Sequence, residues 1–499
     1  MRQAKDANIA VCTIVANNYL AYARTLMQSV AQWHPDWSRY VLLVDRPRPD
    51  YQPDAEPFRT LPLETLNLPE PKRFCFRYTL LELSTAVKPW LLEWLFDHTP
   101  CQQVVYLDPD IRLYRPLGEV TERLDAGQLM VLTPHLTGRL DDKHKPREKD
   151  ILVAGSYNLG FIALGRHPEL PHFLRWWQEK LEYDCRVAWD EGLFVDQRWV
   201  DLAPGMFSDV SILRHPGYNV AYWNLAHRRV ERTPRGYEVN GQPLTFFHFS
   251  GLDPLAPQLV SKHQDRFQLS DLGAAADLVL DYCRAVLANG YETCRSWPCA
   301  YGFFDDGTPI PDCVRLAYRR DEATRARPGD DPFAEKPLWL NEPPGPALEP
   351  LVSRLMMAVW RRWEHLQNLF PDPLGLSRRP FADWYVCRGA WEEHIPDEFV
   401  SPVLQSLRRL RHYAPGAFVR EHRALRESEL LSPLQARALR LVRRAVWWSR
   451  RLRLHRLLPG DPWRTWLKRG IKPFVPKKLR SWVREEMRLY GDARPPAAA

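Results

Sequence analysis

The 499-residue sequence contains no run of about 20 consecutive apolar residues, which a membrane-spanning helix would need. Its opening residues, MRQAKDANIAVCTIV, lead directly into an apolar segment. They lack the succession of basic, apolar and small residues that marks a secretory signal peptide. No internal repeat of fixed period is present either. From these absences we expect a cytoplasmic protein.

Closely spaced pairs of cysteines are also absent from the sequence. The nine cysteines are scattered, and no C-x-x-C pair occurs among them. The densest group, Cys283, Cys294, Cys299 and Cys313, has the spacing of neither a zinc ribbon nor a disulfide framework. We therefore expect reduced thiols that serve as small core residues.

Acidic residues are scarce in one region of the chain. Residues 432–490 contain 17 Lys and Arg but only 3 Asp and Glu, a net charge of +14, whereas the whole chain carries +8. The remainder is therefore mildly acidic, at −6. This basic tail is also rich in Trp and Leu, a composition typical of helices that lie on an anionic membrane surface. A nucleic-acid backbone could meet the same charges, and a solvated helical extension is an equal alternative.

Short apolar segments alternate with helical patterns in the first part of the chain. Residues 8–16 (NIAVCTIVA) and 39–45 (RYVLLVD) have the length and composition of buried strands. Between them, apolar residues recur at helical spacing from Leu20 to Val30. A strand, a helix and a strand over this length predict a parallel crossover unit.

The alternation continues to about residue 260. A helical pattern spans residues 77–98, and Pro89 should divide it at Val87–Lys88. Further strands are expected at residues 101–108, 157–165 and 244–251, with an amphipathic helix over 170–184. The pattern predicts an α/β fold with a mostly parallel sheet. In such sheets, ligands bind at the carboxyl ends of the strands.

The pattern changes after about residue 268 to helices and irregular polar loops, with a Pro-rich connection over residues 325–350. We therefore expect three parts. Residues 1–262 would form the α/β domain, residues 263–430 a mainly helical accessory region, and residues 431–499 the basic, Trp-rich amphipathic tail.

Two aspartates separated by one proline stand at the end of a predicted buried strand, in the sequence VVYLDPDIRLYRPL. Asp108 and Asp110 could form an ordinary acidic turn, since Asp and Pro are common turn residues. They could instead hold a hard divalent cation such as Mg²⁺ or Mn²⁺, which prefers oxygen ligands. His248 could be a third ligand or a core histidine among its phenylalanine neighbours. Three such ligands would leave octahedral positions for two phosphate oxygens and a water.

Five short motifs follow one another in a characteristic order: ANNY (16–19), LDPD (107–110), YNLG (157–160), DQ (196–197) and HFSG (248–251). In this order they resemble the GT-A-fold glycosyltransferases, most closely the family 8 retaining glycosyltransferases, over roughly residues 8–260. The resemblance implies a Rossmann-like GT-A domain. It also implies a metal-dependent hexosyltransferase that moves a sugar, with retention, from a nucleotide-sugar donor (a UDP-sugar) to an acceptor.

The same resemblance implies a role for each motif. Asp108, Asp110 and His248 would bind Mn²⁺ or Mg²⁺. Asn17, Asn18 and Tyr19 would contact the nucleoside, Asn158 and Gly251 would lie at the donor, and Asp196 and Gln197 would be the catalytic pair beside the reacting carbon. In one respect the sequence departs from the family, which has a diphosphate-binding lysine shortly after the glycine. In HFSGLDPLAPQLVSK no lysine stands at that place, and Lys88 or Lys262 could take its role.

The second half resembles a segment attached to bacterial glycosyltransferases of poorly defined function, which says little about chemistry. The implied acceptor is a bacterial glycan or lipid-linked glycan, and residues 432–490 would dock peripherally on the inner face of the cell membrane; a nucleic-acid partner is not expected. If the enzyme inverted configuration, Asp196 would have to act as a base. The alternative function is a catalytically inactive GT-A-fold scaffold that docks through its basic tail.

Overall fold

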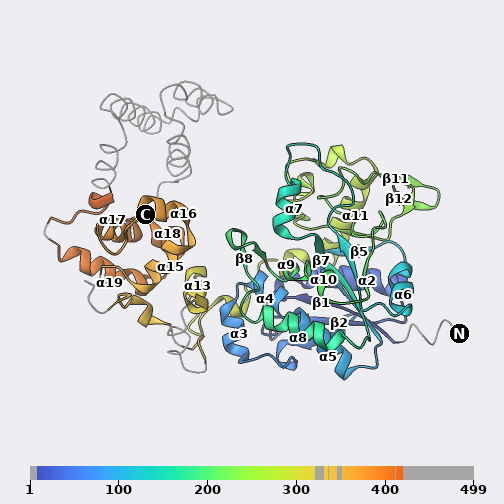
Figure 1. The fold of residues 1–499 in the computed structure, drawn as a ribbon, viewed down its shortest axis with the longest axis horizontal. Helices are drawn as coiled ribbons and strands as arrows, with labels where there is room; N and C mark the ends of the chain where they lie inside the picture. The colour runs from blue at the N-terminus through green and yellow to red at the C-terminus, as the bar shows by residue number, and fades with distance from the viewer. Residues whose placement is uncertain (1–7, 321–330, 335, 346–350, 411, 420–499) are drawn as a thin grey trace, which may run out of the picture. The chain divides into compact units, whose positions relative to one another are not determined.

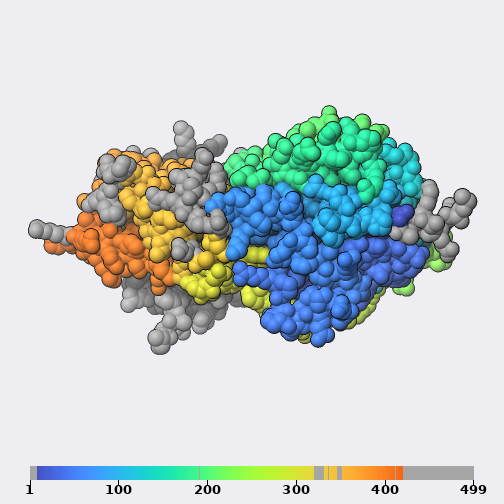
Figure 2. All heavy atoms as spheres, turned by 90° about the horizontal axis from the view of Figure 1, so that it is seen from below, coloured from blue at the N-terminus to red at the C-terminus, as the bar shows by residue number. Residues whose placement is uncertain are grey.

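The computed structural model describes residues 8–320, 331–334, 336–345, 351–410 and 412–419. The predicted basic tail lies outside these residues. The chain forms two compact units, residues 1–340 and 341–499 (Figure 1). In the space-filling view of Figure 2, the N-terminal segments, coloured blue, form much of one face of the first unit.

A seven-stranded sheet forms the centre of the first unit, with the strand order β10-β6-β7-β4-β1-β2-β3. Six strands run parallel to one another, and β7 runs antiparallel to both of its neighbours. The predicted α/β fold with a mostly parallel sheet is thereby confirmed. The strands are β1 (Ile9–Val15), β2 (Ser38–Leu43), β3 (Arg59–Pro62), β4 (Gln103–Leu107), β6 (Met130–Pro134), β7 (Tyr157–Gly165) and β10 (Val210–Ile212).

Helices cover both faces of this sheet, because its central strands are apolar on both sides. Every residue of β1 and of β4 is buried. Helix α2 (Leu20–Trp33) packs on one face, while α5 (Lys88–His98) and α8 (Leu170–Leu181) lie side by side on the other (Figure 1). Burial on both faces is what makes these strands continuous apolar runs rather than alternating ones.

Pro89 divides the helical segment 77–98 as predicted. Helix α4 (Leu80–Ala86) ends before it, and α5 begins at Lys88 with the proline in its first turn. At the other end of α4, Thr79 and Glu82 form a capping box, each side chain accepting from the other's backbone N–H. The break places Lys88 at the start of a buried helix, where it is 1% exposed.

The predicted strand around His248 exists, but it lies outside the seven-stranded sheet. Strand β14 (Phe246–His248) pairs antiparallel with β5 (Ile111–Leu113), and His248 lies opposite Ile111. Strand β5 begins one residue after Asp110, so this two-stranded pairing brings the histidine to the aspartate turn.

The first unit contains several shorter elements. A hairpin of β8 (Val187–Ala188) and β9 (Leu193–Phe194) precedes Asp196, and β11, β12 and β13 form a separate three-stranded sheet. The remaining bounds are β11 (Val230–Thr233), β12 (Gly236–Val239), β13 (Gln242–Pro243), α3 (Pro71–Arg77), α6 (Gly118–Asp125), α7 (Glu148–Ala154), α9 (Gln197–Val200) and α10 (Ala203–Met206).

Residues after 262 also contribute to the first unit. Helices α11 (Ala274–Ala288) and α12 (Tyr291–Cys294) pack against α2, and α13 (Asp312–Arg320) packs against α3. The rings of Phe249 and Tyr282 stack with their centroids 3.9 Å apart, which fixes the end of β14 to α11. The compact units thus divide at Leu340 rather than at residue 262, and the three-part functional division stays a prediction.

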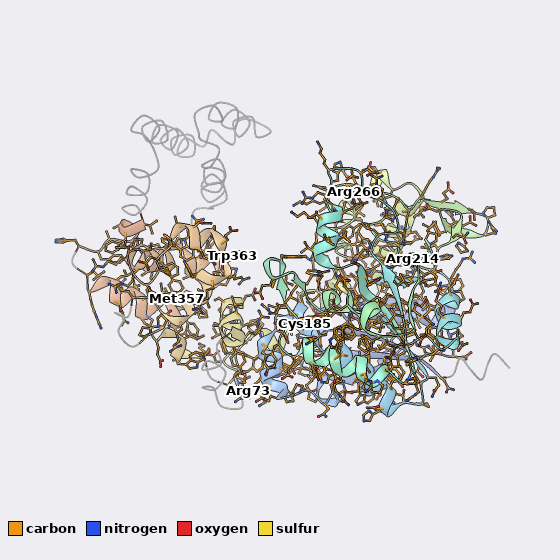
Figure 3. All side chains as sticks on the ribbon, viewed as in Figure 1. Arg73, Cys185, Arg214, Arg266, Met357 and Trp363 are labelled. Carbon is orange, nitrogen blue, oxygen red and sulfur yellow. The ribbon has the colours of Figure 1, made fainter. Side chains whose placement is uncertain are left out.

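The second unit is helical in its described part. Its helices are α15 (Arg354–Arg362), α16 (Glu364–Leu369), α17 (Arg378–Trp384), α18 (Ala390–Glu392) and α19 (Asp397–Arg408). Met357, labelled in Figure 3, lies in α15, and Trp363, also labelled there, directly follows this helix. None of the helices within the described ranges is long and apolar enough to span a bilayer.

Substituting Tyr282→Ala should destabilise the first unit by about 3–5 kcal/mol, because it removes a fully buried aromatic ring stacked on Phe249. Urea unfolding followed by tryptophan fluorescence measures this change. Leu152→Ala serves as a control, because Leu152 is 67% exposed and should change the stability by no more than ~0.5 kcal/mol. Equal stability of the two variants would show that α11 is not part of the core of the first unit.

Candidate functional site

The two aspartates lie in a tight turn between β4 and β5. The backbone N–H of Asp108 donates to the carbonyl oxygen of Gly160 on β7 at 2.7 Å, and the N–H of Ile111 donates back to the Asp108 carbonyl at 3.1 Å. Proline at position 109 fixes the backbone φ of the turn. Both carboxylates are partly exposed, at 31% and 19% of their side-chain surface.

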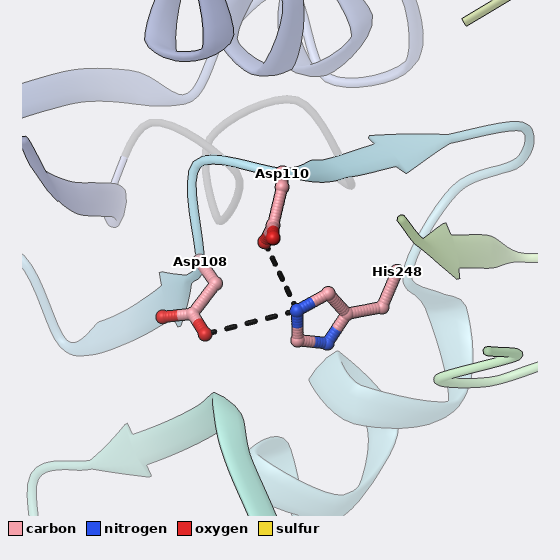
Figure 4. A group of neighbouring side chains, drawn as sticks. All are labelled: Asp108, Asp110 and His248. Carbon is pink, nitrogen blue, oxygen red and sulfur yellow. Dashed lines mark ion pairs between the residues drawn. The ribbon is translucent and has the colours of Figure 1, made fainter. Parts of the chain in front are cut away.

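His248 completes a group of three side chains that could hold a metal ion. Its Nε2 atom lies 3.0 Å from Oδ1 of Asp110 and 3.8 Å from Oδ2 of Asp108. One ligand atom from each residue can be chosen so that all three lie within 4.8 Å of one another, and this is the metal-binding group found among the described residues. Figure 4 shows the imidazole pointing between the two carboxylates. The three residues that the sequence predicted as metal ligands therefore lie together, and that they hold a metal stays a prediction.

A buried amide network orients the imidazole. Nδ1 of His248 lies 3.2 Å from Oδ1 of Asn158 and 3.3 Å from Oδ1 of Asn219. The amide of Asn219 is itself oriented, because its Nδ2 donates to Thr133 Oγ1 at 2.8 Å and to Asn158 Oδ1 at 3.0 Å. Amide oxygens only accept, so Nδ1 carries the hydrogen of these contacts, and Nε2 is the nitrogen that faces the carboxylates; a cation bound there would take the place of a proton on Nε2.

This donor set fits a hard divalent cation. Two carboxylates and one neutral imidazole suit Mn²⁺ or Mg²⁺ with further positions left for phosphate oxygens and water. Histidine ligands characteristically donate their other N–H to an oxygen acceptor, as Nδ1 of His248 does here. Burial by itself lowers the pKa of His248, but the neighbouring Asp110 and Asp108 carboxylates outweigh it and leave that pKa raised.

Glycine is the only residue type that fits at position 160, next to Asp108, Asn158 and His248. A Cβ built on Gly160 would lie 2.4 Å from Cε1 of His248, and 2.8 Å from both Oδ1 of Asn158 and Oδ2 of Asp108. Real Cβ atoms do not approach other heavy atoms this closely. The glycine of YNLG therefore lets the backbone of β7 lie directly against the three ligands.

Lys88 and Asp196, which the sequence assigned to donor binding and catalysis, form a buried ion pair. Nζ of Lys88 lies 2.5 Å from Oδ2 of Asp196 and donates to the carbonyl oxygen of Leu159 at 2.8 Å. Burial raises the pKa of Asp196, although the ammonium of Lys88 opposes the shift. Lys88 also lies 4.1 Å from the ring centroid of Tyr106, whose hydroxyl donates to Asp108 at 2.8 Å. Through Tyr106, the ion pair is thus connected to the turn that carries Asp108 and Asp110.

Gln197 of α9 is bonded to the start of β7, in which Asn158 is the second residue. Gln197 donates through Nε2 to the carbonyl oxygen of Ala154 at 2.8 Å, and its Oε1 accepts from the N–H of Leu159 at 3.4 Å. Asn158 is 8% exposed and holds the imidazole of His248. Their predicted contacts with the donor sugar stay predictions.

Asn17, Asn18 and Tyr19 form a 3₁₀ turn, η1 (Asn17–Tyr19), at the carboxyl end of β1. Asn17 donates through Nδ2 to Oδ2 of Asp45 at 2.7 Å, and the buried Oδ1 atoms of Asn17 and Asn18 have no hydrogen-bond partner within the described part of the chain. Tyr19 is 41% exposed. Desolvation around its hydroxyl, and then the charge of Asp110, raise the pKa of Tyr19 to about 12.

Gly251 adopts the left-handed conformation, at φ +71°, and a Cβ there would clash with His263 and Ser261. The chain then makes a loop and returns, because the N–H of Lys262 donates to the Gly251 carbonyl at 3.0 Å. The exposed Lys262 therefore lies beside Gly251 in space although it is eleven positions later in sequence. This loop explains how a lysine can be near the glycine despite the departure from the family pattern.

The loop that carries Lys262 is joined to the segment before α7. Arg266 donates to both carboxylate oxygens of Asp142, at 2.7 and 2.9 Å, and to the carbonyl oxygen of Pro146 at 2.9 Å. Figure 3 shows Arg266 in the part of the first unit that contains α7. Neither Asp142 nor Arg266 is singled out by any motif.

Sequence reasoning missed the residues that hold the ligands in place. Asn219, Thr133 and Tyr106 belong to none of the five motifs, and Gly160, the last residue of YNLG, had no role assigned to it. Asn219 adopts the left-handed conformation, at φ +52°, which Asn tolerates better than most residues. Its neighbour in the network, Asn224, donates to the Asn219 carbonyl at 2.9 Å. The sequence YNVAYWN offered one signal only, two polar residues within an otherwise apolar and aromatic stretch.

Comparison with known proteins gives matches over about half of the chain. No family model matches. The uncharacterized protein YfnF of Bacillus subtilis (strain 168) is 26% identical over 255 residues, which cover 48% of this chain and 81% of the relative. The solved structure of the galactosyltransferase LgtC with donor and acceptor sugar analogues covers 55% of this chain and 95% of its own, at 16% identity and a TM-score of 0.32. The match to the solved structure of the glycosyltransferase GlyE of Streptococcus pneumoniae TIGR4 covers 59% of this chain and 66% of that structure, at 14% identity and a TM-score of 0.33.

Substituting Gly160→Ala should lower the affinity for Mn²⁺ by about 10- to 100-fold, because the new methyl group would displace His248 or Asp108. Titration of Mn²⁺ followed by electron paramagnetic resonance measures the affinity. Gly118→Ala is the matched control, because no atom lies within 4 Å of a Cβ there. Unchanged Mn²⁺ binding in Gly160→Ala would contradict the assignment of these three ligands.

Proposed function

We propose that the first unit is a metal-dependent glycosyltransferase that transfers a sugar from a nucleotide-sugar donor to an acceptor, with retention of configuration. The observation that carries the proposal is the convergence of Asp108, Asp110 and an oriented His248 at the end of β4. Mn²⁺ or Mg²⁺ held there would neutralise charge on a diphosphate leaving group. A second support is the order of the five motifs in the sequence.

The residues around the metal group suggest how a donor is held. Asn17 and Asn18 would offer their unpaired Oδ1 atoms to N–H or O–H groups of the nucleoside, a UDP moiety in the simplest case. Lys262 would reach the diphosphate from the loop beside Gly251. Asn158, Asp196 and Gln197 would lie at the donor sugar, on the side of the turn formed by the start of β7.

Retention is favoured by the state of Asp196. An inverting enzyme needs a carboxylate base that can reach the acceptor hydroxyl, but Asp196 is 2% exposed and already paired with Lys88. In the retaining step, the bond between the anomeric carbon and the diphosphate oxygen breaks while the acceptor oxygen bonds to the same face of that carbon. The acceptor proton passes to the departing diphosphate oxygen, so that no protein base is required.

The acceptor we propose is a glycan or a lipid-linked glycan, with residues 432–490 as an anionic-membrane anchor. The net charge of +14 in this tail supports the membrane part of the proposal. A catalytically inactive scaffold would keep nucleotide binding without turnover. Assaying hydrolysis of a panel of nucleotide sugars distinguishes the two, since a scaffold would hydrolyse none of them.

Replacing both aspartates, Asp108→Asn with Asp110→Asn, should abolish the part of UDP affinity that depends on Mn²⁺. The two amides remove the negative charge that attracts the cation. Isothermal titration with UDP, with and without Mn²⁺, measures this dependence. Asp54→Asn, at an exposed position, is the control and should behave as the unmodified protein. Retention of Mn²⁺-dependent UDP binding in the double variant would refute the proposed metal role.

Lys262→Gln should weaken binding of UDP in the presence of Mn²⁺ by about tenfold, because one charge-assisted contact with phosphate is lost. Binding of Mn²⁺ alone should not change. Lys143→Gln, another exposed lysine of the same unit, serves as the comparison. If UDP affinity stays the same in Lys262→Gln, the cation opposite the diphosphate must be a different one, with Lys88 the remaining candidate from the sequence.

A further inference from the structure

Asp45, at the end of β2, joins three separate segments at the proposed nucleoside end of the site. It is 1% exposed. Its Oδ2 accepts from the backbone N–H of Asn17 at 3.3 Å and from Nδ2 of Asn17 at 2.7 Å, while Oδ1 accepts from the N–H groups of Arg46 and Ala300, both at 2.8 Å. Both oxygens are therefore used within the protein, so Asp45 positions its neighbours rather than a ligand.

Ala300 belongs to a segment outside the predicted transferase domain of residues 1–262. This segment, residues 297–305, includes the 3₁₀ turn η7 (Ala300–Gly302). Arg315 on α13 fixes it, because the guanidinium donates to the carbonyl oxygen of Tyr301 and, at 2.8 Å, to that of Phe76 at the end of α3. Arg315 is 3% exposed. The segment is thus held on both sides, by Asp45 and by Arg315.

Arg46 is the exposed group that this arrangement presents. Its side chain is 54% exposed, its Nη2 lies 3.5 Å from Oδ1 of Asp305, and its guanidinium carbon lies 5.9 Å from the ring centroid of Tyr301. The backbone carbonyl of Arg46 accepts from Nδ2 of Asn17 at 3.0 Å. Arg46 therefore lies beside the asparagine whose buried Oδ1 has no donor among the described residues.

The position of Arg46 favours a nucleoside over a phosphate. Strand β2 is separated from β4, which carries Asp108, by β1 alone. Two strand spacings correspond to about 10 Å between backbones, so Arg46 lies to the nucleoside side of the metal group and beside Asn17. A guanidinium is planar, stacks on aromatic rings and offers five N–H donors. Both properties suit a nucleobase and its ribose.

We infer that Arg46, held by Tyr301 and Asp305 of segment 297–305, forms the outer wall of the nucleoside subsite and determines part of the donor affinity. The inference rests on the proposed function, since it assigns a residue to the same donor. It also means that a segment beyond the motif-bearing region of the sequence is part of donor recognition.

The test compares Arg46→Gln with Arg48→Gln. Arg48 lies on the same loop, with its guanidinium carbon 4.3 Å from the ring centroid of Trp297, and is the matched control. The ligands are inorganic pyrophosphate and whichever of UDP, GDP, ADP and CDP binds the unmodified protein most tightly with Mn²⁺ present. Arg46→Gln should weaken the nucleotide about tenfold, as expected for the loss of one stacking contact with a base. Pyrophosphate and Mn²⁺ affinities should stay the same, and Arg48→Gln should change none of them.

Unchanged nucleotide affinity in Arg46→Gln would overturn the inference, and so would an equal loss of nucleotide and pyrophosphate affinity, which would make Arg46 a phosphate contact. Retained Mn²⁺ binding shows that the variant is folded. Tyr301→Ala provides a second variant and should weaken the nucleotide in the same direction by releasing Arg46. Failure of the unmodified protein to bind any of the four nucleotides would instead refute the proposed function.

Discussion

The antiparallel pairing of β5 with β14 is the interaction on which the site depends. It sets His248 opposite Ile111, and the next residue, Phe249, donates its N–H to the carbonyl oxygen of Asp110 at 2.9 Å. The histidine and the aspartate turn are thus joined by backbone hydrogen bonds, whose geometry tolerates little displacement. Stacking of Phe249 on Tyr282 supports the pair from α11. The metal group is therefore held by the fold before any ligand binds.

Side-chain amides then determine which imidazole nitrogen faces the carboxylates. The network of Asn158, Asn219 and Thr133 is buried, and in a buried network each hydrogen bond constrains the next. Asn158 would thus serve two purposes, since it lies at the proposed sugar site and also holds His248. A change at the donor sugar could consequently alter the metal ligand without touching it.

The sequence predicted the strands, the break at Pro89 and the meeting of Asp108, Asp110 and His248, because apolar runs, a proline and an ordered set of motifs are local signals. The antiparallel direction of β7 and the exclusion of β14 from the main sheet were not predicted, since a strand's pairing partner leaves no trace in its own composition. Asn219 and Asp45 were beyond prediction as ligand supports for a related reason. Their partners, Thr133 and Ala300, are 86 and 255 positions away, and no spacing rule reaches that far.

The buried ion pair of Lys88 and Asp196 has a consequence for charge balance. Because its two members neutralise each other, the turn keeps the two negative charges of Asp108 and Asp110 when a bound cation holds His248 as a neutral ligand. That excess equals the charge of one divalent cation, so a loaded site would hold a diphosphate by direct coordination to the cation and not by a net positive charge of the site. The positive charge that draws in a diphosphate from a distance would then have to come from the rim of the site, where Lys262 is exposed. Attraction of the donor and binding of the metal would accordingly depend on different residues. Raising the ionic strength would screen the exposed cation first, and so weaken the attraction of the donor before it weakens metal binding.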